Sequence, residues 1–438
     1  MEPIAELRPP MAAHEAWAEA ARCLYCYDAP CARGCPAAVD VAGFIRKIYT
    51  DNLVGAARLL LQANPLAASC ARVCPTEELC LGRCVLPDKG ERPIEIGRLQ
   101  RYVMDRAMER SAPAIPVGPS TGHRVSVVGA GPAGVACAVE LRRHGHAVTV
   151  YDAREKPGGL GTYAIASHKM SAEFAVQEVE WLARALGFQL RLGTRVGEHV
   201  TFQELEETSD AIFLGVGLGL ARLLSIEGEE LPGVVDALEL IAAHRKGAQL
   251  PLSLDSKRVV VIGGGNTATD SALLATLEGA ASCTIAYRRS LTEMPAYASE
   301  LELVQERGVE LLLLHAPRRI LGDGAVSGVE LSPVRLGEPD ASGRRRPEVQ
   351  EDAPTRTLSC DVVIRALGQR VDEGLLGRVD GVAVKRGRMR VDPATGQTTH
   401  PKYFAGGDCV NGGREVVHAV AEGVRAARAI HRLIAKEV

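Results

Sequence analysis

The sequence predicts an α/β protein in which a helical N-terminal head precedes two nested units of parallel sheet. Two observations carry this prediction. Eight of the 12 cysteines lie before residue 85, and the rest of the chain carries two glycine-rich turns, each between an expected strand and an expected helix. Because the thiols and the glycine turns occupy separate stretches, the chain divides into a cysteine-rich head and a glycine-rich body.

Composition excludes several classes of protein. The 438 residues are 46% hydrophobic and 24% charged, which is typical of a globular chain of several domains. The net charge of −3 provides no general attraction to nucleic acid or to a membrane surface. No apolar run approaches the roughly 18–20 residues of a membrane span, and the first ten residues lack a secretory pattern. We therefore expect a cytoplasmic protein that binds neither nucleic acid nor membrane.

The cysteines of the head form two groups. The first is Cys23-x2-Cys26-x4-Cys31-x3-Cys35-Pro36, and the second is Cys70-x3-Cys74-Pro75-x4-Cys80-x3-Cys84. Between them, residues 39–50 and 53–63 have helical composition with an apolar face, which indicates core packing. We expect these two helices to bring the cysteine groups together.

Three kinds of cysteine chemistry compete in the head. Disulfides need an oxidising compartment, to which nothing in the sequence directs the chain. Structural zinc favours paired Cys-x2-4-Cys motifs, which the first group fits in part. The density of thiols and the Cys-x3-Cys-Pro ending of the first group are typical of runs that hold [4Fe–4S] clusters. We favour iron–sulfur, for which eight thiolates would suffice for two clusters, and keep zinc as the alternative.

The first glycine-rich turn lies between an expected strand at 124–128 and a helix that reaches residue 143. In a Rossmann-like unit, Gly129 makes the tight turn, Gly131 lets backbone N–H groups approach a pyrophosphate, and Gly134 permits close helix–strand contact. Pro132 and Ala133 lie between the last two glycines. Asp152 ends the following strand, where an acid accepts hydrogen bonds from a ribose diol.

The second glycine-rich turn follows an expected strand at 259–262. The residues predicted to contact the dinucleotide there are Gly263, Gly265, Asn266, Thr267 and Ala268. The next strand ends on Arg288 and Arg289 and not on an acid. Because paired guanidinium groups suit a 2′-phosphate, this favours NADPH, the alternative being an ordinary solvated pair.

A second pattern repeats after each turn. Residues 209–217 and 360–368 both indicate a strand that runs into a glycine turn, so we place Ala366, Leu367 and Gly368 near the second nucleotide. Near the C-terminus, Gly407 and Asp408 precede a helical segment and can meet the phosphate and ribityl group of a flavin. The body is therefore an approximate duplication in which the second unit interrupts an FAD domain.

These observations give four segments. Residues 1–118 form a helical double [4Fe–4S] domain and residues 119–250 the first FAD-binding segment. Residues 251–365 form the NAD(P)-binding domain, and residues 366–438 complete the FAD-binding domain. Residues 112–122 are expected to be a linker, and residues 323–357 a hairpin or exposed loop.

The order of cysteine head, FAD turn, nested NAD(P) turn and final Gly-Gly-Asp resembles the glutamate synthase small subunit and its relatives. Within that family it is similar to the N-terminal half of dihydropyrimidine dehydrogenase, which bacteria have as a separate NAD(P)H-oxidising subunit. The resemblance implies two interleaved clusters. Their ligands would be Cys23, Cys26, Cys31 and Cys84 for one, and Cys35, Cys74, Cys80 and Gln100 for the other.

The resemblance leaves two residues to interpret. Cys70 has no cluster and is expected to be a buried thiol beside the site. After Gly159 and Leu160, which we include among the flavin contacts, the family usually has an arginine near the flavin. Here the stretch at 165–169 ends on Lys169, which is the candidate to take its place.

The resemblance further implies an electron-input subunit. NAD(P)H would reduce FAD, and single electrons would leave through the two clusters to an FMN-containing partner that reduces uracil or thymine. Hydride transfer needs positioning more than acid–base side chains, so we expect no catalytic dyad or triad. The alternatives are a glutamate synthase small subunit, a related ferredoxin-type oxidoreductase, or a zinc-stabilised flavoprotein scaffold. The choice between NADH and NADPH stays open, because the bacterial pyrimidine enzymes use NADH while keeping similar basic residues.

Overall fold

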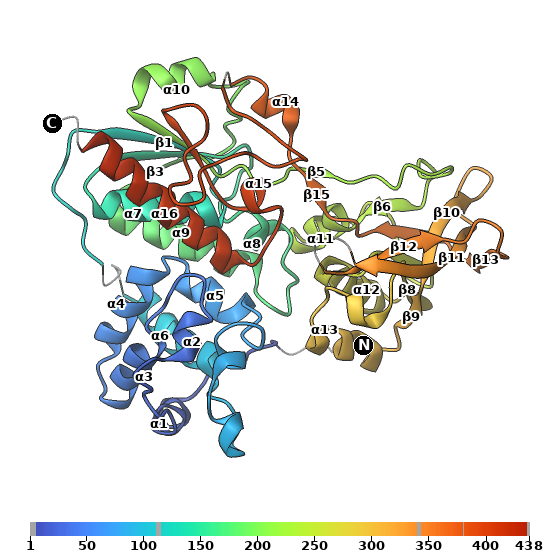
Figure 1. The fold of residues 1–438 in the computed structure, drawn as a ribbon, viewed down its shortest axis with the longest axis horizontal. Helices are drawn as coiled ribbons and strands as arrows, with labels where there is room; N and C mark the ends of the chain where they lie inside the picture. The colour runs from blue at the N-terminus through green and yellow to red at the C-terminus, as the bar shows by residue number, and fades with distance from the viewer. Residues whose placement is uncertain (1–5, 111–114, 340–342, 380, 436–438) are drawn as a thin grey trace. The chain divides into compact units, whose positions relative to one another are not determined.

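The computed structural model describes residues 6–110, 115–339, 343–379 and 381–435 (Figure 1). They form two compact units. One comprises Ala221–Gln369, and the other combines the chain up to Leu220 with Arg370 onward. The chain passes from one unit to the other at strand β5 (Leu220–Ala221) and returns at strand β15 (Gln369–Arg370). These two strands pair with each other.

The head is helical. Its helices are α1 (Ala13–Ala21), α2 (Pro30–Arg33), α3 (Val41–Tyr49), α4 (Leu53–Ala63), α5 (Ala67–Val73) and α6 (Ile96–Met108). Asp40 and Asn52 begin α3 and α4 by accepting hydrogen bonds from the backbone N–H groups of Gly43 and Gly55. The apolar faces of both helices are buried. The prediction of two core helices between the cysteine groups is therefore confirmed.

The body of the same unit is a five-stranded parallel sheet with the order β16-β4-β1-β2-β3. The strands are β1 (Arg124–Val128), β2 (Ala147–Tyr151), β3 (Gln189–Arg191), β4 (Ala211–Leu214) and β16 (Tyr403–Ala405). Its main helices are α7 (Pro132–Arg143), α9 (Ala172–Leu186) and α16 (Val416–Ile434), with the shorter α8 (Leu160–Tyr163), α10 (Phe202–Thr208), α14 (Glu373–Leu376) and α15 (Asp408–Asn411). Since β16 comes from the C-terminal segment and pairs with β4, the chain returns to complete this sheet, as the sequence predicts.

The other unit also contains a parallel sheet, with the order β6-β14-β7-β8-β9. The strands are β6 (Val234–Asp236), β7 (Arg258–Ile262), β8 (Ser282–Tyr287), β9 (Glu310–Leu313) and β14 (Val362–Arg365), and the helices are α11 (Ala237–Arg245), α12 (Asn266–Leu277) and α13 (Ala298–Glu306). Because β6 pairs with β14, the unit begins at Ala221 and not at the 250/251 boundary suggested by the sequence.

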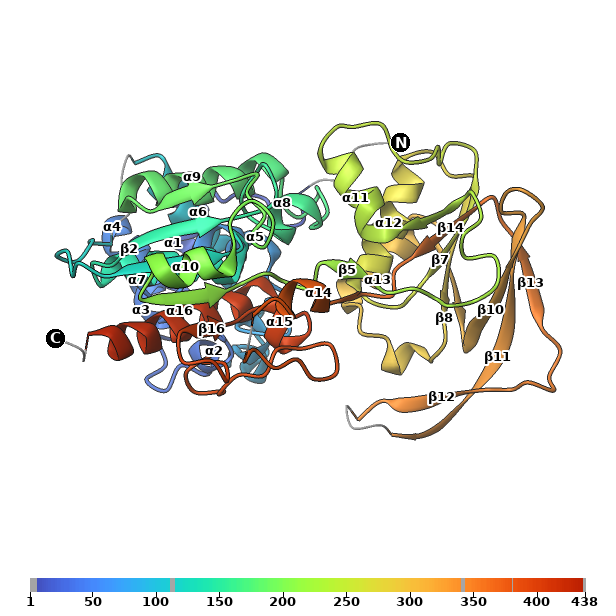
Figure 2. The ribbon, with the colours of Figure 1, turned by 90° about the horizontal axis from the view of Figure 1, so that it is seen from above.

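An antiparallel sheet extends this second unit. It contains β10 (His315–Leu321), β11 (Gly328–Pro339), β12 (Arg345–Val349) and β13 (Arg356–Ser359), and both β12 and β13 pair with β11. Figure 2 shows the ribbon of β11 and β12 reaching beyond the parallel sheet. The hairpin expected within residues 323–357 is therefore present. Throughout the described ranges, no helix combines the length and apolar character needed to cross a membrane.

Candidate functional site

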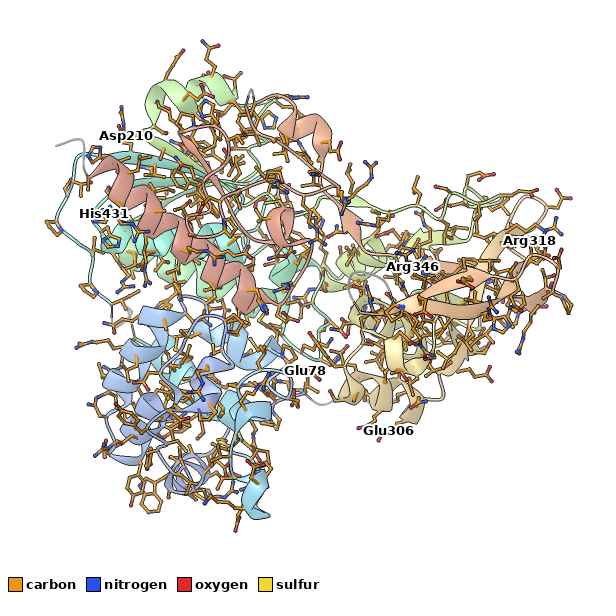
Figure 3. All side chains as sticks on the ribbon, viewed as in Figure 1. Glu78, Asp210, Glu306, Arg318, Arg346 and His431 are labelled. Carbon is orange, nitrogen blue, oxygen red and sulfur yellow. The ribbon has the colours of Figure 1, made fainter. Side chains whose placement is uncertain are left out.

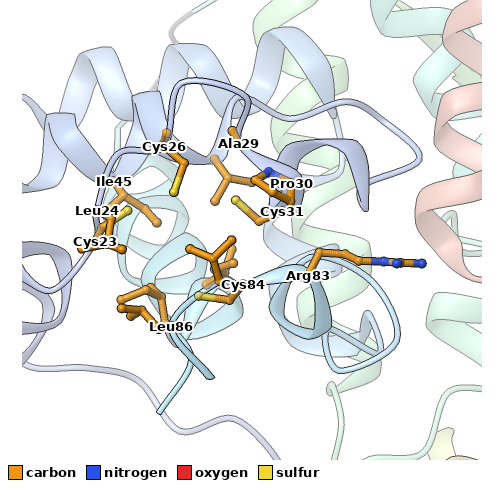
Figure 4. Close-up of a pocket in the computed structure, with 15 residues that line it drawn as sticks. Cys23, Leu24, Cys26, Ala29, Pro30, Cys31, Ile45, Arg83, Cys84 and Leu86 are labelled. Carbon is orange, nitrogen blue, oxygen red and sulfur yellow. The ribbon is translucent and has the colours of Figure 1, made fainter. Parts of the chain in front are cut away.

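One pocket of the head collects four thiols. Cys23, Cys26, Cys31 and Cys84 border a space of about 410 Å³, part of which is open to solvent, and Arg83 and apolar residues such as Ile45 complete the lining. Figure 4 shows the four cysteine side chains around this space. Three come from the first sequence group and one from the second, so the structure brings together the cysteines that the resemblance assigns to one cluster.

Two thiols of this pocket, those of Cys23 and Cys31, lie in an environment that disfavours a free thiolate. Burial, followed by the neighbouring thiols, raises the pKa of Cys31 to about 11, and burial also raises the pKa of Cys23. Binding to a metal centre deprotonates a thiol outright, so the donors suit a metal better than free nucleophiles. Among the described residues, no three His, Cys, Asp or Glu side chains are placed to hold a single metal ion. The four thiols instead border a shared space, as a cluster of several atoms requires.

A second group of thiols lies deeper in the head. Cys70 and Cys74 are buried and packed together with Cys35. Contact with the Cys70 thiol, followed by burial, raises the pKa of Cys74, and burial with Cys74 and Cys35 nearby raises the pKa of Cys80 to about 12. The structure therefore brings the three cysteines assigned to the second cluster close together and places Cys70 beside them.

Gln100 is buried on α6. Its side-chain Nε2 donates a hydrogen bond of 2.6 Å to the carbonyl of Ala67, the first residue of α5. This helix carries Cys70 and ends just before Cys74. The hydrogen bond thus ties Gln100 to the cysteine-bearing helix and not to a thiol, and its role as an iron ligand stays a prediction.

The first glycine turn has no space for a Cβ at Gly129 or at Gly134. Gly129 has a φ of 107°, and a Cβ there would lie 2.3 Å from the carbonyl oxygen of Gly215. A Cβ on Gly134 would lie 1.9 Å from the carbonyl oxygen of Gly129. The turn therefore brings the N-terminus of α7, where Pro132 and Ala133 follow Gly131, directly against the end of β1.

Asp152 fixes this turn from the end of β2. Its Oδ2 accepts a hydrogen bond of 2.7 Å from the backbone N–H of Ala130, and its Oδ1 accepts one of 2.8 Å from Arg154. A carboxylate has about four acceptor positions. Asp152 can therefore hold the turn and still accept from the ribose that the sequence analysis assigns to it.

Two other predicted flavin segments meet the same turn. A Cβ on Gly159, which precedes Leu160 and α8, would lie 2.8 Å from the Cα of Gly131, and one on Gly407 would lie 2.9 Å from the Cβ of Ala133. Three segments far apart in the sequence therefore converge at the N-terminus of α7. Lys169 lies half-buried in the turn between α8 and α9.

The sequence analysis missed Glu422, which supports this region from α16. Its Oε2 accepts a hydrogen bond of 2.6 Å from the backbone N–H of Gly407, and it also accepts one from the Asn411 side chain. Burial, with Glu422 and Glu415 nearby, raises the pKa of Asp408 to about 6. The helix α16 is amphipathic and carries several basic residues, so nothing in its local sequence distinguishes Glu422 from an acid that faces water.

The second unit repeats the arrangement at its own glycine turn. A Cβ on Gly263 would lie 2.3 Å from the carbonyl oxygen of Ala366, which precedes Leu367 and Gly368. Asn266, which follows Gly265, accepts a hydrogen bond of 3.1 Å from the backbone of Tyr297. Thr267 and the buried Ala268 continue the first turn of α12. The residues that the sequence predicts to contact the second dinucleotide therefore lie next to one another.

The arginine pair after β8 separates into two environments. Arg288 is exposed, whereas Arg289 is 7% exposed and its Nε donates a hydrogen bond of 2.8 Å to the carbonyl of Arg345. The two guanidinium groups are therefore not equivalent, contrary to the paired role that the sequence suggests.

Family comparisons match nearly the whole chain. Residues 1–112 match the model described as dihydropyrimidine dehydrogenase domain II, 4Fe-4S cluster, and residues 123–423 match pyridine nucleotide-disulphide oxidoreductase. The glutamate synthase [NADPH] small chain of Escherichia coli is 36% identical over 442 residues, covering 97% of this chain and 93% of the relative. The NAD-dependent dihydropyrimidine dehydrogenase subunit PreT of Escherichia coli is 33% identical over 431 residues, covering 98% and 97%.

Solved structures agree on the fold. FprA from Mycobacterium tuberculosis has a TM-score of 0.62 at 20% identity, covering 72% of this chain and 85% of that one. Thioredoxin reductase from T. acidophilum has a TM-score of 0.55 at 21% identity, covering 71% of this chain and 98% of that one.

The comparisons identify the cofactors and overturn the zinc-scaffold alternative, because the head matches a 4Fe-4S domain. The protein is an NAD(P)H-dependent oxidoreductase that uses FAD and iron–sulfur. The likeness to the dihydropyrimidine dehydrogenase subunit is no greater than that to the glutamate synthase small chain. The chain belongs to the glutamate synthase small-subunit-like family of FAD- and NAD(P)-dependent oxidoreductases with an N-terminal 4Fe-4S domain.

Proposed function

We propose that this chain is the electron-input subunit of a hetero-oligomeric dihydropyrimidine dehydrogenase. It oxidises NAD(P)H through FAD and two [4Fe–4S] clusters and supplies an FMN-containing partner that reduces uracil or thymine to 5,6-dihydropyrimidines. The observation that carries the electron-transfer part is the pocket of four thiols drawn from both cysteine groups. The description of the matched head domain supports the pyrimidine assignment.

The chain's own residues would position the cofactors and leave the redox chemistry to them. The turn from Gly129 to Gly134 presents the N-terminus of α7 to a pyrophosphate, and Asp152 holds that turn closed. Glu422 fixes Gly407 beside it. FAD, when bound, supplies the change from two-electron to one-electron transfer.

A second candidate is the small subunit of a glutamate synthase. The specific observation in its favour is the identity of 36% to the Escherichia coli small chain, against 33% to the pyrimidine subunit. Both candidates are electron-input subunits. They differ in the partner that receives the electrons.

The partner assignment can be tested with the purified chain. With NAD(P)H it should reduce ferricyanide but leave uracil unchanged, and dihydrouracil should form only after the FMN-containing subunit is added. Capture of the native complex, followed by mass spectrometry, should identify that subunit. Dihydrouracil formation by the chain alone would overturn the electron-input role, and capture of a glutamate synthase large chain would select the second candidate.

Cluster ligation makes a separate prediction. Cys84→Ser should remove one cluster, because Cys84 is the only member of the second cysteine group among the four thiols of the pocket. Iron should fall from about eight to about four per chain, with weaker absorption near 400 nm and unchanged FAD. Cys70→Ser is the matched control and should keep all the iron, whereas Gln100→Ala should lose the other cluster. Equal iron in all four proteins would contradict the assignment.

A further inference from the structure

Four histidine rings gather where the last turn of α16 meets the loop between α7 and β2. His146 is fully buried in that loop, and His431 lies near the C-terminal end of α16 (Figure 3). The ring centroids of these two residues are 5.1 Å apart, and the ring of His144 stacks on that of His431 at 4.0 Å. The ring of His123, which directly precedes β1, lies 6.0 Å from that of His146. These four residues form the histidine cluster.

Both ring nitrogens of His146 are engaged. Nδ1 lies 2.7 Å from the hydroxyl of Thr121, in the segment that enters β1, and Nε2 lies 2.9 Å from Nδ1 of His431. A neutral imidazole has one donor and one acceptor, so a neutral pair of rings satisfies both contacts. An imidazolium has two donors and no acceptor. When both rings are protonated, two donors therefore face each other and the contact between His146 and His431 is lost.

The acids near the cluster are engaged elsewhere. The charged groups that face the cluster are Glu140, Arg142 and Arg143 on α7, Arg428 on α16, and Asp210 before β4. Glu140 binds Arg143 and Arg428, and Asp210 accepts a hydrogen bond of 2.7 Å from the backbone N–H of Arg124. Burial, followed by the charge of His431, lowers the pKa of His146 to about 4. The central pair of rings therefore excludes a second proton.

Helix α16 connects the cluster to the predicted flavin segments. It packs closely on α7, because a Cβ on Gly423 would lie 2.1 Å from the carbonyl oxygen of Ala133. The preceding residue, Glu422, accepts the hydrogen bond from the backbone N–H of Gly407. Ala133 and Gly407 both lie where the predicted flavin segments converge. A movement of α16 away from α7 would therefore disturb these segments.

We propose that the histidine cluster is a pH-sensitive latch, which holds the end of α16 at neutral pH and releases it on acidification, thereby weakening the binding of FAD. Because the pKa of His146 is lowered in the folded protein, its contribution to stability is complete above about pH 6.5 and is lost as the pH falls toward about 4. The latch acts on FAD binding and is independent of the partner that receives the electrons.

The rate of FAD release, followed by flavin fluorescence at pH 7.5 and at pH 5.5, tests the latch. Lowering the pH should accelerate release in the wild type roughly tenfold more than in His146→Gln, because pH 5.5 lies about one unit below the ordinary histidine pKa. His431→Gln should show an intermediate acceleration, since His146 stays buried but loses the neighbouring charge. Arg432→Gln is the matched control and should respond as the wild type does, because Arg432 is an exposed cation in the same turn of α16.

The comparison between variants isolates the cluster from other groups. Asp408, whose pKa is about 6, titrates in the same range, but it is present in all four proteins. Equal acceleration in the wild type and in His431→Gln would overturn the latch. Because His431 is only half-buried, this variant decides the question even if His146→Gln does not retain FAD at pH 7.5. A response of Arg432→Gln as small as that of His431→Gln would also overturn the latch, by assigning the effect to the general charge of the helix end.

Discussion

Replacing Gly134 with alanine is expected to leave the protein unable to retain FAD. The added Cβ would lie 1.9 Å from the Gly129 carbonyl oxygen and 3.1 Å from the Cγ1 of Val127. One neighbour is backbone of the turn and the other belongs to a buried strand, so α7 must move away from β1. Overpacking of this kind typically costs about 1–3 kcal/mol, and occasionally more. The ratio of flavin to protein after gel filtration measures the loss.

The second glycine turn provides the control for this experiment. Ala268 stands there at the place that corresponds to Gly134. Ala268→Gly makes the reverse exchange, and its expected cost is the roughly 0.5–1 kcal/mol of a glycine within a helix. This variant should keep its FAD, and both variants should keep their iron. A normal flavin content in Gly134→Ala would show that the first turn does not hold the flavin.

Glu178→Gln is expected to weaken the attachment of the head to the body of the same unit. Glu178 is fully buried on α9, and its two oxygens accept hydrogen bonds of 2.9 and 3.0 Å from the backbone N–H groups of Ala68 and Ser69 at the start of α5. The Ser69 hydroxyl donates to the same carboxyl group. Glutamine has one acceptor oxygen, so one buried N–H would face another donor, at a cost of about 1–3 kcal/mol.

The thermal midpoint for loss of the cluster absorption near 400 nm measures this effect. It should fall clearly in Glu178→Gln and stay unchanged in Glu180→Gln, because Glu180 is an exposed acid on the same helix. An unchanged midpoint in both variants would mean that the carboxyl group does not stabilise the head.

Glu178 also makes the stability of this attachment depend on pH. Burial raises its pKa to about 7 from the ordinary value of 4.5. A carboxyl group whose pKa is raised in the folded state contributes its full stability below the unfolded value, and this contribution is lost as the pH rises through about 7. The midpoint of the wild type should therefore decrease between pH 5 and pH 7.5, and Glu178→Gln should lack this part of the decrease. An identical pH dependence in both proteins would assign it to other groups.

Short-range features of the fold could be predicted from the sequence. The glycine turns, the flanking strands and the helices between the cysteine groups follow from patterns within about 15 residues. The boundary of the second unit could not be predicted, because β6 has only three residues and is recognised by its pairing with β14. The different environments of Arg288 and Arg289 could not be predicted either. The carbonyl that accepts a hydrogen bond from Arg289 belongs to Arg345 in the hairpin, which lies far along the chain.

The sequence analysis missed Glu178 and Glu422 for the same reason. Glu178 and Glu422 both lie on amphipathic helices, where an acid normally faces water. Each instead accepts hydrogen bonds from backbone N–H groups outside its own helix, Ala68 and Ser69 for the first and Gly407 for the second. A single sequence contains no local signal for such long-range partners.

The late return of the chain to its first sheet has a consequence for biosynthesis. Ribosomes deliver residues 221–369, a complete and contiguous unit, before Tyr403–Ala405 exist to pair with β4. That unit can therefore fold while the sheet interrupted by it still lacks its edge strand and the Gly407–Asp408 turn. The flavin would then be acquired near the end of translation, after the nucleotide unit has formed. A nascent chain stalled before residue 400 should consequently be able to bind nicotinamide nucleotide while still failing to bind FAD.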